Sequence, residues 1–322
     1  MKSLLKPYYK LKKWLAIKPL YDYNFKRFVK YSSRKDTEES LIGALTMAAH
    51  GIEKGLTMGN FRATFGRDKL LMLLRRGLIY VQKYGTENIQ IHHIAKVVND
   101  YKLCHERINY QLDDELIEKI NTFLSHFDCP SDSEIQINCT KDRFFSKRSS
   151  DFYEFSNSRH SCRDYDGTPV PIDTIDKAVQ LAQNAPSACN RQPARIYVIE
   201  SKEKMRQVLN LHGGNRGFAE KIDKLIMICG YIPCYNSAER DCVYTDCGIF
   251  AMNLAYALHY YGVGACILNW SVTPEKDKAA RNIIPVPEEE VICSLISCGN
   301  VPNKFKVCNS GKKDLNRILH HI

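Results

Sequence analysis

The sequence predicts an α+β fold, in which helices flank a mixed sheet in the C-terminal half and a mostly helical domain precedes it. Apolar residues recur at helical spacing from about 38 to 125, and short strand-like runs alternate with helical runs after residue 150. Of the 322 residues, 44% are hydrophobic and 25% are charged, as in an ordinary folded protein. We expect a leader arm over 1–35, a helical domain and linker over 36–150, and a second domain over 151–322.

The leader arm carries the whole formal excess of positive charge. Residues 1–35 hold eleven Lys or Arg and one acid, Asp22, and the net charge of the chain is +10. Tyr, Trp and Phe side chains lie between these bases. Such a segment can rest on an anionic membrane surface, dock on a partner or pack on the body of its own chain. No nucleic-acid partner is expected.

The helical domain is predicted by two sets of apolar residues, Leu41, Leu45, Ala48 and Ala49, and then Leu70, Leu73, Leu74 and Leu78. Residues 128–156 contain Cys129-Pro130-Ser131-Asp132-Ser133 and a serine-rich stretch, which is typical of a linker. The boundary between the domains is therefore expected near residue 150.

The second domain is predicted to alternate between helices and strands. Helices are expected at 172–184 and 202–211, and strands at 195–200, 224–230, 264–269 and 291–298. Residues 248–268 carry no formal charge and are long enough to span a bilayer. Asn253, His259 and two glycines favour instead a buried helix, a turn and a strand.

The cysteines indicate a reducing, cytoplasmic setting. There are thirteen of them, an odd number, and the sequence shows no export signal. Three pairs have four residues between their members, which does not fit the two-residue knuckles of zinc or iron–sulfur sites: Cys229 with Cys234, Cys242 with Cys247, and Cys293 with Cys298. We expect buried, inert thiols and no metal site.

Two segments of the second domain carry residues suited to binding chemistry. Ser158-Arg159-His160-Ser161-Cys162-Arg163-Asp164-Tyr165 places two guanidiniums beside a hydroxyl, and Arg offers forked donors to phosphate oxygens. Ala185-Pro186-Ser187-Ala188-Cys189-Asn190-Arg191-Gln192-Pro193 places short polar side chains in a proline-bounded loop, which can read the edge of a planar heterocycle. Each segment alone is also compatible with a solvated loop or a helix end.

Taken in order, these segments resemble the paired signature of the nitroreductase-like flavoproteins. Gly214-Asn215, Asp246 and Gly262-Val263-Gly264-Ala265 follow at the matching places, so the resemblance covers roughly residues 155–322. It implies a nitroreductase-like α/β sandwich that binds FMN. Arg159 and Ser161 would hold the phosphate and ribityl chain, with His160 in the same binding segment. Arg163 would lie near the pyrimidine edge of the flavin, where a cation stabilises the anionic reduced form.

The resemblance also implies a homodimer with the flavin site at the subunit interface. Pro186, Ser187 and Asn190 match the segment that reaches the flavin from the partner subunit, and Gln192 is a further cofactor-binding candidate in the same signature. Asn215 matches a position that contacts the flavin ring or ribityl chain.

Two positions depart from the family pattern. Members commonly end with a basic pair that clamps the phosphate, and Lys312 and Lys313 are the candidates here. Many members have an acidic residue and a glycine whose backbone faces flavin N5. At the matching place this chain has Leu268, Asn269 and Trp270. A backbone donor can survive that change, but the indole would narrow the substrate pocket.

The implied reaction is a ping-pong cycle, in which NAD(P)H reduces FMN and leaves before an oxidised small molecule takes the electrons. Nitroaromatics or quinones would serve as surrogate acceptors. Other readings remain open: reductive dehalogenation or a dehydrogenation on the same scaffold, or a non-catalytic flavin-binding or membrane adaptor.

The N-terminal half has a motif of its own, His50-Gly51-Ile52-Glu53-Lys54-Gly55-Leu56. It resembles the leader domain of some nitroreductase-like proteins associated with bacterial surface-polysaccharide biosynthesis. His50 and Glu53 would lie on one helix face, which suits an acid/base pair. The same residues suit a surface ion pair at a helix end with Gly55 as the C-cap.

Overall fold

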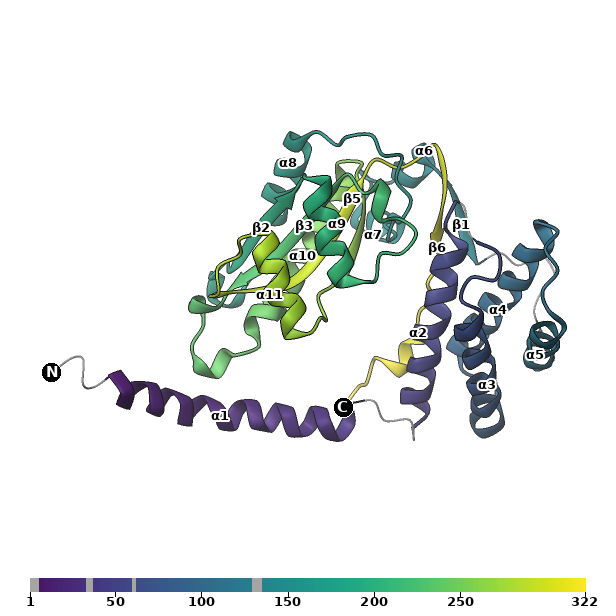
Figure 1. The fold of residues 1–322 in the computed structure, drawn as a ribbon, viewed down its shortest axis with the longest axis horizontal. Coiled ribbons are helices and arrows are strands. Elements are labelled where there is room, and N and C mark those ends of the chain that lie inside the picture. The colour runs from purple at the N-terminus through teal and green to yellow at the C-terminus, as the bar shows by residue number, and fades with distance from the viewer. Residues whose placement is uncertain (1–5, 33–36, 60–61, 129–134) are drawn as a thin grey trace. The chain divides into compact units, whose positions relative to one another are not determined.

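The computed structural model describes residues 6–32, 37–59, 62–128 and 135–322 (Figure 1). The chain divides into two compact units. The sheet unit comprises residues 1–32 and 142–302, and the helical unit comprises 33–141 and 303–322. The units therefore change at 141/142, whereas the sequence placed the boundary near 150. The last segment of the chain also folds with the helical unit, because its strand completes a small sheet there.

The helical unit confirms the helical pattern expected over 38–125. Its helices are α2 (Glu38–Leu56), α3 (Arg67–Tyr84), α4 (Ile89–Arg107) and α5 (Asp114–Leu124). Leu45, Leu73 and Ile94 are at most 1% exposed, so the periodic apolar positions form the core. Helix α2 runs past Gly55 to a C-cap at Thr57, so the expected glycine cap is wrong. Gly55 instead makes room for the Phe65 ring, which a Cβ would approach to 2.0 Å.

A two-stranded antiparallel sheet lies where a linker was expected. Strand β1 (Gln136–Thr140) pairs with β6 (Lys304–Cys308). Helices α6 (Lys141–Phe145) and α7 (Phe152–Ser158) follow, so the linker expected over 128–156 is largely structured. The turn-rich residues 129–133 lie outside the described residues. The five-residue strand β1 gains its hydrogen bonds from a strand far along the chain, and a local sequence pattern cannot reveal that partner.

The sheet unit is an α/β sandwich, as predicted. Its described strands lie in the order β2 (Ala194–Ile199), β3 (Lys224–Tyr231), β5 (Glu290–Gly299) and β4 (Gly264–Asn269). Every pairing in this order is antiparallel, whereas the sequence predicted a mixed sheet. The difference arises because α9 runs back from the end of β2 and residues 213–223 return the chain to that end, so β3 starts beside the last residue of β2.

Helices cover the sheet on both faces. Ile226 and Ile228 of β3 belong to the same apolar cluster as α8 (Ile172–Ala182) and α10 (Cys242–Tyr260). Leu225 and Met227 point the opposite way and are also fully buried. Helices α9 (Lys202–His212) and α11 (Pro274–Ile283) contact each other. Such two-sided burial explains the continuous apolar run of β3.

The uncharged stretch at 248–268 divides as predicted into the end of α10, a turn and β4. Gly262 takes φ of +77° in that turn, a conformation that favours glycine. Among the described residues, no helix combines the length and apolarity that a membrane span requires.

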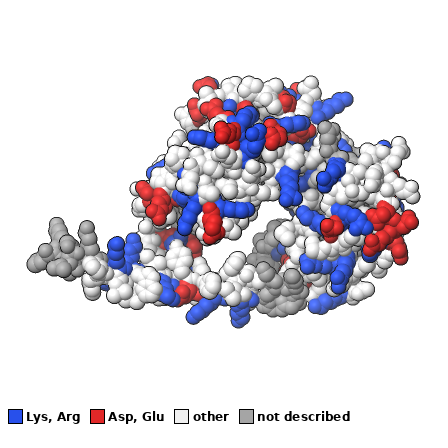
Figure 2. Space-filling model, in the orientation of Figure 1, with Lys and Arg blue, Asp and Glu red and all other residues white. Residues whose placement is uncertain are grey.

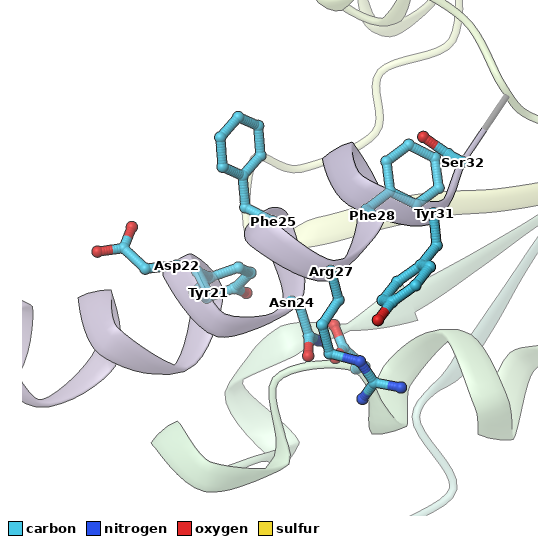
Figure 3. Close-up of a pocket in the computed structure, with 9 residues that line it drawn as sticks. Tyr21, Asp22, Asn24, Phe25, Arg27, Phe28, Tyr31 and Ser32 are labelled. Atoms are coloured by element: carbon cyan, nitrogen blue, oxygen red, sulfur yellow. The ribbon is translucent and has the colours of Figure 1, made fainter. Parts of the chain in front are cut away.

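The leader arm forms α1 (Lys6–Tyr31), a helix of 26 residues. Its large apolar side chains remain outside the core, and Trp14, Phe25 and Phe28 are between 55% and 72% exposed. Figure 2 shows Lys and Arg side chains spread along it. The amide of Asn24 donates to Asp241 over 2.8 Å, near the start of α10. Figure 3 shows Arg27 on the same side of α1 as Asn24, with Phe25 on the opposite side.

Candidate functional site

Residues 158–165, which we call the arginine segment, run along the edge of the main sheet. The Cys162 amide donates to the Ala265 carbonyl of β4 over 2.9 Å. The Tyr165 hydroxyl lies 2.9 Å from the Cys162 carbonyl and 3.0 Å from the Ser297 carbonyl, and both Cys162 and Tyr165 are fully buried. These contacts hold the backbone rigidly, so Arg159, Ser161 and their neighbours project from a fixed support.

Arg159 is a half-buried cation with one buried, unsatisfied donor. It follows directly after α7, and its Nε atom is buried without a hydrogen-bond partner. Burial lowers the pKa of its guanidinium from the ordinary value. A buried donor left unpaired costs about 1–3 kcal/mol, so an arginine of this kind is suited to an external anion. This observation supports the sequence prediction of a phosphate contact here.

Further basic side chains lie near Arg159, around the buried ring of His259. This ring is 2% exposed, and Nε2 lies 2.9 Å from the Ser158 hydroxyl. Burial, and then the charges of Arg159, His160 and Arg148 in that order, together lower the pKa of His259 to about 4. Basic side chains from three places in the chain therefore gather near the C-terminal end of α10. Sequence reasoning read His259 only as evidence against a membrane span and missed this location.

Residues 185–193, which we call the proline loop, adopt a strained conformation. Cys189, Asn190 and Gln192 have φ of 53°, 55° and 49°, in the left-handed region that few residues other than glycine enter. The Ser187 hydroxyl accepts from the Gln192 amide over 2.9 Å, and its carbonyl accepts from the Asn190 amide over 2.9 Å. Strain of this kind persists only where surrounding contacts enforce it, and it is frequent at binding sites.

Asp246 of α10 anchors the proline loop. One of its carboxylate oxygens accepts from the Ala188 amide over 3.0 Å and from the Tyr235 hydroxyl over 2.5 Å. The side chain is 6% exposed. A cavity of about 210 Å³ lies against the loop and is lined by Pro186, Ser187 and Asp246 among others. The sequence identified Asp246 as a family match but did not predict that it fixes this loop.

The arginine segment and the proline loop meet opposite ends of α10. Asp246 lies in the second turn of this 19-residue helix and His259 in its last turn. At 1.5 Å per residue these two residues are about 20 Å apart along the axis. Pro186, Asn190 and Gln192 are exposed, so this side of the loop is open to a partner. Within one sheet unit the two segments are thus well separated.

The remaining candidates of the sheet unit have local partners. The Asn215 amide donates to the Leu209 carbonyl near the end of α9, and the residue is 7% exposed. Asn269 is exposed and donates to the Ser271 hydroxyl over 3.1 Å. The Trp270 indole donates to Asp277 of α11 over 2.8 Å and stacks on His212 with the ring centroids 6.5 Å apart. Trp270 is therefore held firmly at the end of β4.

Lys312 and Lys313 lie in the helical unit, not in the sheet unit that holds Arg159. Lys313 pairs with Glu39 of α2 over 2.8 Å. Lys312 is exposed.

The described cysteines are free thiols, and most of them are buried. Burial raises the pKa of Cys162, Cys229 and Cys298 to about 12, so these groups stay protonated and unreactive. The expectation of inert thiols holds for these three residues.

The fold and the two segments define an α/β sandwich with a cationic site beside a fixed loop. Residues 157–214 match the model of the Nitroreductase family, and this range contains both the arginine segment and the proline loop. This match supports the resemblance stated from the motifs of the second domain.

Relatives extend the match over about half of the chain. A Methanothermobacter thermautotrophicus protein named "Putative NADH dehydrogenase/NAD(P)H nitroreductase" is 26% identical over 51% of this chain and 82% of its own length. A protein of the same name from Archaeoglobus fulgidus is 26% identical over 44% and 80%. Human iodotyrosine deiodinase 1 is 35% identical, but over only 20% of this chain and 23% of its own length.

Proposed function

We propose that the protein is an FMN-dependent oxidoreductase that takes electrons from NAD(P)H and delivers them to an oxidised small molecule in a ping-pong cycle. The observation that carries this proposal is the buried, unpaired Nε of Arg159 within a group of basic side chains. The family match over both segments supports a phosphate-bearing flavin as the ligand of that cationic site. The resemblance of the His50–Leu56 motif suggests surface-polysaccharide biosynthesis as the setting.

The site residues fit the proposed cofactor through their charge and their fixed positions. Arg159 would neutralise the phosphate, with His160 and Ser161 beside it. Arg163 would stabilise the negative charge of the reduced ring. Bound FMN would supply the hydride acceptor and donor that no side chain provides.

The proposal includes five further candidates for contact with the cofactor or substrate: Asn215, Asn269, Trp270, Lys312 and Lys313. The Asn215 amide is already hydrogen-bonded, and Lys313 already has an ion-pair partner. Trp270 is held in place by Asp277, so a rigid indole would bound the space open to substrates near Asn269.

Absorbance of the purified full-length protein tests the function. We expect a flavin spectrum that NAD(P)H bleaches without oxygen and that a quinone or nitroaromatic restores. The Arg159→Ala protein would lack the spectrum, whereas an Arg206→Ala control on exposed α9 would keep it. Purified protein with no flavin, and no uptake of added FMN, would contradict the proposal.

A second reaction on the same site is reductive dehalogenation. It is favoured by the 35% identity to human iodotyrosine deiodinase 1, although that match covers 66 residues. Incubating the reduced protein with a halogenated phenol and measuring halide release would distinguish it. A flavin that NAD(P)H does not bleach, but whose reduced form releases halide, would favour this reaction.

The separation of the two segments along α10 supports a homodimer. A ligand held by the arginine segment of one subunit would receive the exposed proline loop from its partner. Sedimentation equilibrium should therefore give a dimer. A monomer that retains FMN and turns over would show that the loop serves its own subunit.

For α1 we propose that an anionic membrane surface is its partner. The helix contains eight Lys or Arg and one Asp, and its aromatic side chains are exposed, so it offers both charge and groups that settle among lipid headgroups. Bases and aromatics occur all round the helix, which implies that charge rather than one apolar face would dominate binding.

A further inference from the structure

A carboxylate in the helical unit lies between two histidines. Glu53 of α2 is 1% exposed, and its Oε2 lies 3.0 Å from Nδ1 of His50 one turn earlier. Its Oε1 lies 3.5 Å from Nε2 of His93 on α4. The expected surface ion pair at a helix end is therefore wrong, because the carboxylate is buried and has a second imidazole beside it.

A thiol completes this group. Cys308, the last residue of β6, is 5% exposed, and its sulfur lies in a set with the His50 and Glu53 ligand atoms in which all are within 4.8 Å of one another. The Ser310 amide donates to Oε1 of Glu53 over 2.9 Å. Residues from α2, α4 and the C-terminal segment thus meet at one point within a single compact unit.

This combination of donors has the chemistry of a transition-metal site. Zinc prefers four ligands drawn from imidazole nitrogen, thiolate sulfur and carboxylate oxygen, at about 2.0–2.3 Å. In a tetrahedron of such bonds the donor atoms are about 3.5 Å apart. The 3.0 Å spacing between Nδ1 of His50 and Oε2 of Glu53 is already close to that value. The ligand atoms of His50, Glu53 and Cys308 all lie within 4.8 Å of one another, so these three side chains would close on one ion by rotating toward it.

We propose that His50, Glu53 and Cys308 bind one divalent transition metal, with Zn²⁺ as the preferred ion and a water as the fourth ligand, while His93 holds the other oxygen of the Glu53 carboxylate. The neutral His50 imidazole, the Glu53 carboxylate and the Cys308 thiolate would be the protein ligands, so binding would release the thiol proton. The Ser310 amide would then orient the Glu53 carboxylate from outside the ligand set, as hydrogen bonds to metal ligands commonly do.

The backbone around the site supports a fixed ligand geometry. A Cβ at Gly311 would lie 2.8 Å from Nδ1 of His93, so the glycine allows the C-terminal segment to lie directly against this ring. That contact limits rotation of His93 and keeps Nε2 toward Glu53. The site would fasten the C-terminal segment to α2 and α4, a role distinct from electron transfer in the sheet unit.

Cobalt titration of the full-length, reduced protein tests the proposal, because Co²⁺ takes the same ligands and reports on them by absorbance. We expect one equivalent of Co²⁺ to give visible bands of tetrahedral coordination and an ultraviolet band from a thiolate ligand. Zn²⁺ should displace it stoichiometrically. Cys308→Ser should remove the thiolate band, and Cys139→Ser, a buried thiol on β1, should leave it.

A second pair of variants separates ligation from folding. His50→Ala removes a ligand that is partly exposed, and His92→Ala removes an exposed histidine next to His93. We expect Zn²⁺ to raise the melting temperature of the wild-type and His92→Ala proteins, and to shift that of His50→Ala much less. Absence of a thiolate band, or a band unchanged by Cys308→Ser, would overturn the proposal. These readouts do not depend on flavin, so they stand apart from the proposed reaction.

Discussion

Replacing Arg159 by alanine should destabilise the flavin-bound protein and leave the stability of the flavin-free protein nearly unchanged. In the flavin-free protein Nε of the guanidinium is buried and unpaired, a state that costs about 1–3 kcal/mol. Removing it therefore should not lower the stability of the apoprotein, and relief of this cost offsets the lost packing of the aliphatic stem. With FMN, the same change removes a charge-assisted contact worth about 1.5–3 kcal/mol.

That loss corresponds to roughly 10- to 150-fold weaker FMN binding. At a fixed FMN concentration, a 100-fold rise in Kd removes about 2.7 kcal/mol of ligand-linked stability. Arg159→Lys keeps the charge but not the forked donors, so we expect an intermediate Kd.

Fluorescence titration of apoprotein with FMN gives Kd, and thermal unfolding with and without FMN gives the two stabilities. Arg206→Ala, which removes an exposed cation from α9, is the matched control. An Arg159→Ala apoprotein that is clearly destabilised, with unchanged FMN affinity, would show that Arg159 is a structural residue and would refute the reasoning.

Other perturbations have equally definite expectations. The folded-state pKa of His259 is lowered to about 4, so the unfolding free energy of the apoprotein should be highest above pH 6.5 and fall by up to about 3 kcal/mol toward pH 4. Urea unfolding of His259→Gln should show a weaker pH dependence. Asp246→Ala should lower the unfolding free energy by about 1–3 kcal/mol because the Ala188 amide and the Tyr235 hydroxyl lose their shared acceptor, and unchanged urea midpoints would contradict that. A protein beginning at Thr37 should no longer sediment with phosphatidylserine vesicles while the full chain does so at low salt only; equal pelleting of both would remove α1 from the interaction.

Much of the fold could be predicted because it depends on local patterns. Helical spacing predicted the helical region over 38–125, and the apolar run at 224–230 predicted strand β3. Strands β1 and β6 could not be predicted in this way, since each is five residues long and pairs with a segment far along the chain. The antiparallel order also depends on how residues 213–223 return the chain, which periodicity does not encode.

The candidate site was predictable to a similar extent. The motif around Arg159 identified the cationic segment, because arginine, serine and histidine next to one another form a recognisable string. The roles of Asp246 and His259 depend on burial and on contacts across the fold. Asp246 serves as an anchor because two donors from separate segments converge on it, and only the folded structure shows that convergence.

The insertion of the sheet unit into the helical unit has a consequence for synthesis on the ribosome. Helices α2 to α5 are synthesised early. Strand β1 cannot pair until β6 is synthesised, after the whole of residues 142–302. During that interval β1 has an unpaired edge, the kind of surface on which nascent chains associate wrongly. A premature stop codon shortly before β6 would leave the sequence of the sheet unit complete. It would nevertheless destabilise the helical unit, because β1 would lack its partner strand.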